Sequence, residues 1–318
     1  MTASADGPRV NGAFVHEALL YGGAEEYLAG TLPFLRGGLA AGEPLLVAVP
    51  GPNLELIRNS LGPVGDRVRF IDMTEAGRNP GRIIPAVLHA FVDEHRALRV
   101  RIIGEPIWPG RSAMEYPACV QHEALINDAF AGRSATILCP YDAKGLDPEA
   151  LGDAARTHPV MVYGDDRRPS DGYADPGSVV AEFNRPLPEP VGSPAIMIFN
   201  AEELPAVRQF VAHHAGLIGL VPERIGDLRL AINELATNSI VHAGGPGVLR
   251  IWHESDGDHV VCEIRDGGHV TDRLAGRIPP AATSERGRGL LLVNYLCDLV
   301  RIHTKESQTT IRLYVRRR

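Results

Sequence analysis

Residues 227–244 read DLRLAINELATNSIVHAG, and this stretch says most about the C-terminal half of the chain. Its apolar residues recur at steps of three and four, which predicts an amphipathic helix over 222–243. The apolar stripe consists of Ile225, Leu228, Ile232 and Leu235. Glu234 and Asn238 lie four residues apart, so they share a different face of that helix. Taken alone, the helix favours a solvent-exposed surface for both side chains.

Two short motifs follow that helix. RDGG (265–268) ends a predicted strand with a carboxylate, Asp266, followed by glycines that let a planar ligand approach the backbone. ERGRGLLLV (285–293) places Gly287 and Gly289 directly before an apolar helix, whose first N–H groups and dipole attract an anion. Each motif alone also fits an ordinary turn or helix start. The three stretches together, in this order, favour a ligand site.

Residues 198–316 resemble the ATP-binding domain of the GHKL superfamily and, within it, the bacterial anti-sigma-factor serine kinases. ELATNSIVHA resembles the N box, RDGG the adenine-binding box, ERGRGLLLV the second glycine box, and TTIRL the closing strand motif. The chain departs from the family pattern at Gln308, where a glycine is usual, and at His269-Val270, where a last glycine is missing. The short segment between the glycine boxes resembles the anti-sigma kinases more than the gyrase or chaperone branches.

The resemblance implies that this domain binds ATP and Mg²⁺. Asn238 would supply an oxygen to Mg²⁺, and Glu234 would accept the proton of an attacking serine hydroxyl. Asp266 would accept a hydrogen bond from the adenine amine. The other implied nucleotide contacts are Gly268, Arg286, Gly287, Arg288, Gly289, Leu290 and Thr309. His242 belongs to the motif, but its expected role is local packing or hydrogen bonding.

The first half of the chain alternates helical segments with short β-branched runs. Helices are predicted around 24–41, 53–60, 81–95, 116–131 and 148–156. Strands are predicted at 45–49, 68–72, 100–104, 135–139 and 160–164. This alternation predicts an α/β fold with a doubly wound, largely parallel sheet that is covered on both faces. The sequence has no GxxxxGK[ST], so no phosphate-binding P-loop is expected.

The second half has a different order of elements. Helices are predicted at 203–217, 222–243 and 288–298, and strands at 248–254, 259–266, 299–305 and 309–316. The alternation within these strands fits an antiparallel sheet with one covered face, which makes an α/β sandwich. Proline cannot continue a helix or a central strand, so the RPLPEP region predicts a linker over 184–194. The expected domains are therefore 12–183 and 195–318.

Residues 12–165 resemble the MEDS sensory domain of bacterial regulators, for which recognition of small organic compounds has been proposed. The resemblance rests on stretches such as GEPIWP (104–109) and LCPYDAKGLDPEALGDAARTHPVMV (138–162). A sensory pocket is one hypothesis for the polar and aromatic residues near strand ends. These residues are His16, Glu105, Trp108, Cys139, Tyr141, Asp142 and His158. For any single one, packing or turn capping is the favoured interpretation.

Composition restricts the function classes. The chain has 318 residues and a formal net charge of −7, which disfavours a nucleic-acid binder. The polar start is not expected to be a signal peptide, and no apolar run approaches the ~18 residues that span a bilayer. Four scattered cysteines without a CxxC pair indicate reduced thiols and a cytoplasmic location. The histidines show no HExxH or comparable spacing, so no structural metal site is expected.

The leading functional hypothesis is a cytoplasmic regulator that joins a sensory domain to an ATP-dependent anti-sigma-factor kinase. The resemblance implies that it sequesters a sigma factor, phosphorylates serine or threonine on a STAS-type anti-anti-sigma antagonist, and forms a homodimer. The main alternative is a nucleotide-binding module that sequesters its partner without phosphoryl transfer. A sensor histidine kinase ranks lower, because no dimerising helix pair precedes the ATP domain. A simple ATPase is also disfavoured.

Overall fold

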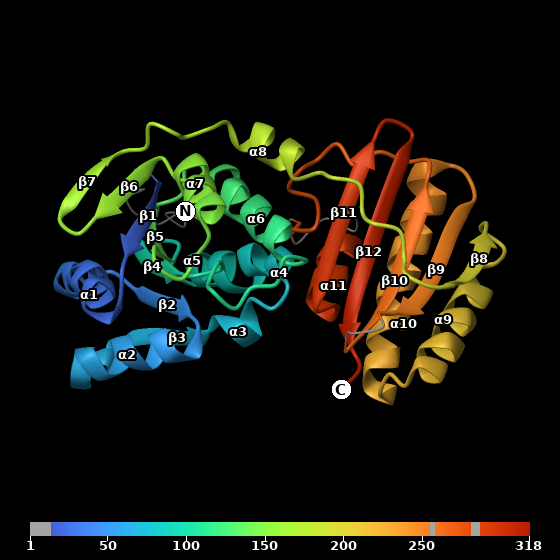
Figure 1. The fold of residues 1–318 in the computed structure, drawn as a ribbon, viewed down its shortest axis with the longest axis horizontal. Helices are drawn as coiled ribbons and strands as arrows, with labels where there is room; N and C mark the ends of the chain where they lie inside the picture. The colour runs from blue at the N-terminus through green and yellow to red at the C-terminus, as the bar shows by residue number, and fades with distance from the viewer. Residues whose placement is uncertain (1–13, 255–257, 281–286) are drawn as a thin grey trace, which may run out of the picture. The chain divides into compact units, whose positions relative to one another are not determined.

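The computed structural model describes residues 14–254, 258–280 and 287–318, and this part of the chain divides into two compact units. The first unit holds the residues up to 77 together with 86–179, and the second holds 78–85 together with 180–318. Each unit contains one sheet (Figure 1). Within the described ranges, every helix is too short or too polar to cross a membrane.

The first unit is built on a seven-stranded sheet in the order β3-β2-β4-β5-β1-β6-β7. Its strands are β1 (Val15–Tyr21), β2 (Leu45–Val49), β3 (Val68–Asp72), β4 (Val100–Gly104), β5 (Ala135–Asp142), β6 (Val160–Tyr163) and β7 (Asp166–Pro169). All neighbouring strands are parallel except β6 and β7, which pair antiparallel. The prediction of a largely parallel α/β sheet is therefore confirmed.

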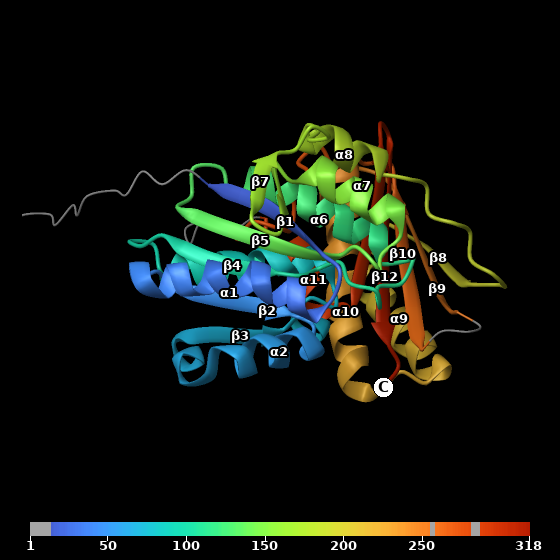
Figure 2. The same ribbon diagram turned by 60° about the vertical axis from the view of Figure 1, so that its left-hand side comes forward.

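Helices accompany this sheet between its strands. They are α1 (Ala24–Ala41), α2 (Gly51–Leu61), α3 (Met73–Ala76), α5 (Ala90–Glu94), α6 (Tyr116–Ala129) and α7 (Pro148–Thr157), with a 3₁₀ segment over Gly62–Arg67. The helix α8 (Pro176–Glu182) follows β7, where the chain passes from the first unit to the second. Leu19 and Leu138 pack in one core cluster with side chains of α1 and α2. Because successive side chains of a strand alternate between faces, His16 and Cys139 lie on the opposite face, where α6 packs (Figure 2).

Two elements in the first half of the chain differ from the sequence prediction. The helix expected over 81–95 is divided into α4 (Pro80–Ile83), a π-helical stretch over Ile84–His89, and α5. Pro85 lies inside this stretch and has no N–H to donate, so the regular hydrogen-bond ladder is interrupted there. The central strand β1 was not predicted, because His16 and Glu17 interrupt its apolar run, although both are buried.

The second unit contains a five-stranded antiparallel sheet in the order β11-β12-β10-β9-β8. Its strands are β8 (Ala195–Phe199), β9 (Gly247–His253), β10 (His259–Asp266), β11 (Leu299–Lys305) and β12 (Gln308–Arg316). Its main helices are α9 (Leu204–Ile218), α10 (Pro222–Asn238) and α11 (Gly289–Leu296). Figure 1 shows α9 and α10 running alongside these strands, and their apolar side chains share one core with the sheet. This is the predicted α/β sandwich.

The helix expected over 222–243 has two parts. Its α-helical part ends at Asn238, and a π-helical turn continues over Ser239–Ala243. Gly244 closes the turn with a φ of 67° in the left-handed region, which glycine adopts without steric cost. Single π turns inside helices often occur at functional sites. The change of helical register places Ser239 where it contacts the end of β10.

The segment predicted as a linker makes specific contacts with the second sheet. Asn184 donates to the carbonyl of Thr304 and accepts from its N–H group. The carbonyl of Pro188 accepts a hydrogen bond from Arg312 at 2.7 Å. Glu189 pairs with two arginines of the sheet, and their hydrogen bonds lower the pKa of its carboxyl to about 2. The proline-rich stretch is thus attached along the sheet face that the helices leave open.

Candidate functional site

A cavity of about 420 Å³ opens in the second unit between α10, the end of β10, β12 and the start of α11. Both polar and apolar residues line it. Of the sequence-predicted contacts, the lining residues are Asn238, Asp266, Gly268, Gly287, Gly289, Leu290 and Thr309. Residues up to 76 positions apart in the sequence, such as Leu235 and Ile311, therefore meet at one site only after folding.

The N box and the second glycine box meet at Gly289. A Cβ built on Gly289 would lie 3.2 Å from Asn238 Nδ2 and 3.2 Å from Glu234 Oε2. Glu234 and Asn238 are both half-buried, so they do not form the solvent-exposed surface that the helix alone favoured. Glycine at this position lets the start of α11 approach both side chains closely. The carboxylate and the amide therefore stand beside the first N–H groups of a helix.

Asp266 is fixed by two hydrogen bonds at the end of β10. The N–H of Gly268 donates to Asp266 Oδ1 at 2.8 Å, and the hydroxyl of Ser239 donates to Oδ2 at 2.5 Å. Thr309 in turn donates to the carbonyl of Gly268 at 3.0 Å and is almost fully buried. These bonds set the orientation of the carboxylate and of the glycine loop. A fixed carboxylate at the wall of a cavity can accept a hydrogen bond from a ligand N–H group.

The other lining residues give the cavity an apolar part. Those with large apolar side chains are Leu235, Ile264, Val270, Leu274, Ile278, Leu290 and Ile311. A mainly apolar pocket with a few fixed polar groups is typical of small-ligand sites. Here the carboxylate of Asp266 stands next to apolar walls, which suits the base of a nucleotide.

The start of α11 provides an anion-binding end to the same cavity. Gly287 has a φ of 88°, a conformation that favours glycine, and it turns the chain into the helix. The first N–H groups of a helix have no partners within the helix, and its dipole attracts negative charge there. Gly287, Gly289 and Leu290 all line the cavity. This end can hold phosphates, and the nearby oxygen of Asn238 is the kind of hard ligand that Mg²⁺ prefers.

Three predicted residues stand apart from the lining. Glu234 reaches Gly289 but does not itself line the cavity. Arg288 is exposed and is absent from the lining, and Arg286 lies outside the described residues. His242 lines the cavity with an exposed side chain. The predicted arginine clamp therefore stays a prediction.

Sequence reasoning missed Ser239. It lies inside the N box, yet a serine after an asparagine carries no pattern that points to a distant carboxylate. Only the packing of the π turn against β10 brings its hydroxyl to Asp266.

The residues of the hypothetical sensory pocket divide into two groups in the first unit. His16, Cys139, Tyr141 and His158 lie together and share a contact with Glu123 of α6, which was not predicted. Glu105 belongs to a second group, where it accepts hydrogen bonds from Asn53 and two tyrosines, and burial raises the pKa of its carboxyl to about 8.

Two further members of that hypothesis have ordinary structural roles. The Trp108 ring stacks under the guanidinium of Arg111 at 4.0 Å. Asp142 accepts hydrogen bonds from the N–H groups of Lys144 and Gly145, which is the capping role that its position favoured.

Comparison with known protein families gives two matches in separate parts of the chain. Residues 15–159 match MEDS, the methanogen/methylotroph DcmR sensory domain. Residues 199–315 match a histidine kinase-like ATPase domain. No curated protein matches the chain.

Two solved structures show remote similarity. The RsbU and RsbW domains of Rv1364c from Mycobacterium tuberculosis are 20% identical, with a TM-score of 0.30, over 38% of this chain and 32% of that one. The flagellar accessory protein FlaH from Methanocaldococcus jannaschii is 12% identical, with a TM-score of 0.29, over 49% of this chain and 75% of that one. This chain thus spans about a third of the Rv1364c chain, and similarities this low assign no function. By its two family matches, the chain carries an N-terminal MEDS domain and a C-terminal histidine kinase-like ATPase domain of the GHKL type.

Proposed function

We propose that this protein is a regulatory kinase of the anti-sigma type, which binds MgATP and phosphorylates a serine or threonine of an anti-anti-sigma antagonist. The observation that carries the proposal is the meeting of Glu234 and Asn238 at Gly289, beside the cavity. A carboxylate and a metal-binding amide one helical turn apart are the two groups that transfer of a phosphoryl group to a hydroxyl requires.

The nucleotide would occupy the cavity with its base against the apolar walls and Asp266. Its phosphates would face the first N–H groups of α11. Asn238 would hold Mg²⁺, which neutralises phosphate charge when it is bound. In this arrangement the N–H of Gly268 and the hydroxyl of Ser239 keep the carboxylate of Asp266 ready to accept from the adenine amine.

Glu234 would act on the partner's hydroxyl. It accepts the hydroxyl proton while the oxygen forms a bond to the γ-phosphorus, and the bond to the β-phosphate oxygen breaks to release ADP. The products are a phosphorylated antagonist and MgADP. An unphosphorylated antagonist would bind the kinase in place of the sigma factor and so release that sigma factor. A small molecule bound by the MEDS domain would shift the balance between these two complexes.

A second function is favoured by one observation, because Glu234 does not line the cavity. In that case the protein binds nucleotide and sequesters its partner without phosphoryl transfer. The two functions differ in the role of the Glu234 carboxylate, so one variant separates them.

The test uses the full-length protein, MgATP labelled on the γ-phosphate, and the STAS-type antagonist recovered from native cells by MgATP-dependent pull-down. We expect label on a serine or threonine of the antagonist. Glu234→Gln should bind MgATP as the wild type does but transfer phosphate at least ~100-fold more slowly. Glu223→Gln, at an exposed position of the same helix, is the matched control and should transfer normally.

The outcomes separate the alternatives. If the wild type binds both MgATP and the antagonist but transfers no phosphate, the sequestration function holds and the kinase proposal is wrong. If it does not bind MgATP, both proposals fail.

A further inference from the structure

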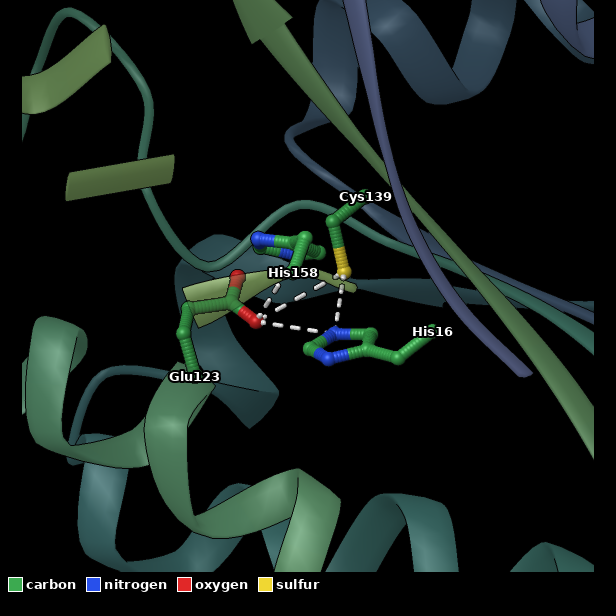
Figure 3. Close-up of side chains that lie close together, drawn as sticks. All are labelled: His16, Glu123, Cys139 and His158. Atoms are coloured by element: carbon green, nitrogen blue, oxygen red, sulfur yellow. Dashed lines mark hydrogen bonds and ion pairs between the residues drawn. The ribbon is translucent and has the colours of Figure 1, made fainter. Parts of the chain in front are cut away.

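Four side chains from separate segments of the first unit converge at one buried point (Figure 3). They are His16 of β1, Glu123 of α6, Cys139 of β5 and His158, which follows α7. Each is at most 1% exposed. One nitrogen, sulfur or carboxylate oxygen from each lies within 4.8 Å of all the others. The proposed ATP-dependent activity uses none of these groups.

Four of the six distances between these atoms are close to the edges of a tetrahedron around a metal ion, and all six are within 4.8 Å. Glu123 Oε2 lies 3.3 Å from His16 Nε2 and 3.5 Å from His158 Nε2. Cys139 Sγ lies 3.5 Å from His16 Nε2 and 3.7 Å from Glu123 Oε2. Bonds of about 2.0 Å to nitrogen or oxygen and 2.3 Å to sulfur give tetrahedral edges of about 3.3 Å and 3.5 Å.

The hydrogen bonds on the far side of His16 fix its tautomer. Its Nδ1 faces Asn127 Oδ1 at 3.2 Å. Asn127 Nδ2 lies 2.8 Å from the carbonyl of Thr157 and 3.2 Å from that of Ala124, so the amide oxygen must be the atom that faces the ring. An oxygen there can only accept, so Nδ1 carries the proton and Nε2 presents a lone pair.

His158 is oriented in the same way. Its Nδ1 lies 2.8 Å from the carbonyl of Ala154, which can only accept, so the proton again resides on Nδ1. Its Nε2 is buried without a hydrogen-bond partner and is directed at the carboxylate of Glu123. A carbonyl behind the distal ring nitrogen is the arrangement that usually supports a metal-bound histidine.

These assignments leave acceptors facing acceptors. Two imidazole lone pairs meet Glu123 Oε2, and the thiol of Cys139 offers one weak donor. The hydroxyl of Tyr141 donates to Glu123 Oε1 at 3.2 Å. This bond orients the carboxylate but provides no donor to Oε2. Unpaired polar groups in a buried position are costly. A cation at the centre would satisfy every one of them.

The protonation states suit a metal as well. Burial lowers the pKa of both His16 and His158 to about 3, so both rings are neutral at pH 7, which a metal ligand requires. Burial raises the pKa of Glu123 and of Cys139. A divalent ion would reverse that effect, because a thiolate and a carboxylate cancel its charge and leave a neutral complex in the core.

We propose that these four side chains form a closed tetrahedral site for a divalent transition metal of the zinc class. All four positions are filled by protein, which is typical of structural rather than catalytic zinc sites. The ion would tie β1, β5, α6 and the segment after α7 together. The sequence contains no linear ligand motif, and for that reason no structural metal site was expected. A linear motif is not needed here, because the four ligands come from four separate segments of the chain.

The first test measures metal in the untagged full-length protein purified without chelators. We expect about one zinc-class ion per chain, as a closed four-ligand site holds one ion. After the metal is stripped, Co²⁺ should restore an intense tetrahedral spectrum with a thiolate-to-metal charge-transfer band, and Zn²⁺ should raise the melting temperature. A wild type that carries no metal, gives no such spectrum and melts at the same temperature with and without Zn²⁺ contradicts the proposal and leaves only a hydrogen-bonded cluster.

Variants assign the ligands. Cys139→Ala should lose the charge-transfer band and the melting shift, whereas Cys119→Ala, a buried cysteine outside the cluster, should keep both. His158→Ala should likewise lose the shift, and His89→Ala, another buried histidine, should retain it. A band that survives Cys139→Ala would overturn the assignment. Should a ligand variant not fold, the wild-type spectrum and its metal-dependent melting still decide. MgATP binding is expected to be unchanged by Cys119→Ala.

Discussion

The backbone of Gly289 lies so close to the side-chain amide of Asn238 that a Cβ on the glycine would come within 3.2 Å of Asn238 Nδ2. Contacts of 3.0–3.4 Å to a Cβ are tighter than nine in ten real ones. The same atom would meet Glu234 Oε2 at 3.2 Å. Gly289 thus acts as the spacer that allows a helix start and the polar face of α10 to form one site.

We expect Gly289→Ala to weaken MgATP binding by roughly tenfold or more, which corresponds to about 1.4 kcal/mol, because its methyl group displaces Asn238 and Glu234. Isothermal titration calorimetry measures this. Gly226→Ala is the control, since a Cβ at this position of α10 meets open space. Alanine in place of that helical glycine should stabilise the fold by about 0.5–1 kcal/mol and leave binding alone. If Gly289→Ala and Gly226→Ala bind MgATP with equal affinity, the close contact of Gly289 with Asn238 and Glu234 is not part of the binding site.

Asn238→Ala should reduce nucleotide affinity only when Mg²⁺ is present, because the amide oxygen is assigned to the metal rather than to the nucleotide. Nucleotide titrations with and without EDTA separate the contribution of the metal from a direct contact between Asn238 and the nucleotide. Asn233→Ala provides a control on the same helix, where the side chain accepts a hydrogen bond from Arg208 instead of lining the cavity. A loss of affinity of the same size in EDTA would mean that Asn238 contacts the nucleotide directly.

Glu263 is fully buried on the sheet face opposite the helices, and its carboxylate pairs with three arginines of the strands. Glu263→Ala leaves Arg312, itself 3% exposed, without its carboxylate partner, so the free energy of unfolding should fall by about 3 kcal/mol. Chemical denaturation monitored at Trp252, which lies on the same sheet, reports the change. The exposed pair of Glu55 with Arg58 is a contrast, for which Glu55→Ala should cost about 0–1 kcal/mol. Comparable losses at both positions would show that burial of Glu263 adds nothing.

The carboxyl of Glu105 makes the stability of the first unit depend on pH. Its pKa is raised to about 8, first by burial and then by the charge of Asp142, while Asn53, Tyr21 and Tyr27 oppose the shift. The native state therefore keeps a proton that the unfolded chain releases above its usual pKa near 4.5. Stability should fall as pH rises between those values, by at most about 1.4 kcal/mol per pH unit, and level off above pH 8.

Glu105→Gln removes that titration. Unfolding of the first unit can be followed by Trp108 fluorescence in a Trp252→Phe background, since the chain has two tryptophans. Relative to the variant, the protein with Glu105 should lose stability steadily from pH 5 to pH 8. A constant difference over that range would mean that Glu105 ionises normally in the native state.

The elements with clear local patterns could be predicted from the sequence. The apolar run LLVAV became β2 at its predicted residues, and the stripe of α10 placed Leu228, Ile232 and Leu235 in the core. The central strand β1 escaped prediction because its polar residues His16 and Glu17 are buried by contacts with distant segments. Edge strands β7 and β8 were missed as well. The residues of β7 are all exposed, and β8 is a run of five apolar residues that shows no polar–apolar alternation in its sequence.

The candidate nucleotide site shows the same division. Residue types and order placed Asn238, Asp266 and Gly289 in one site before any geometry was known, and all three line the cavity. The partner of Asp266, Ser239, and the close contact at Gly289 depend on how α10 packs against β10 and α11. No local pattern encodes such a distance.

What the sequence alone determined is therefore the identity of the segments: two domains, their element types, and the motifs of an ATPase domain. These follow from hydrophobic period and turn chemistry, which act between neighbours along the chain. Only the tertiary structure decided which side chains from distant parts of the sequence meet in one buried cluster. His16, Glu123, Cys139 and His158 have nothing in common along the chain, and they become one buried cluster because parallel strands and the covering helix bring four segments to a single point.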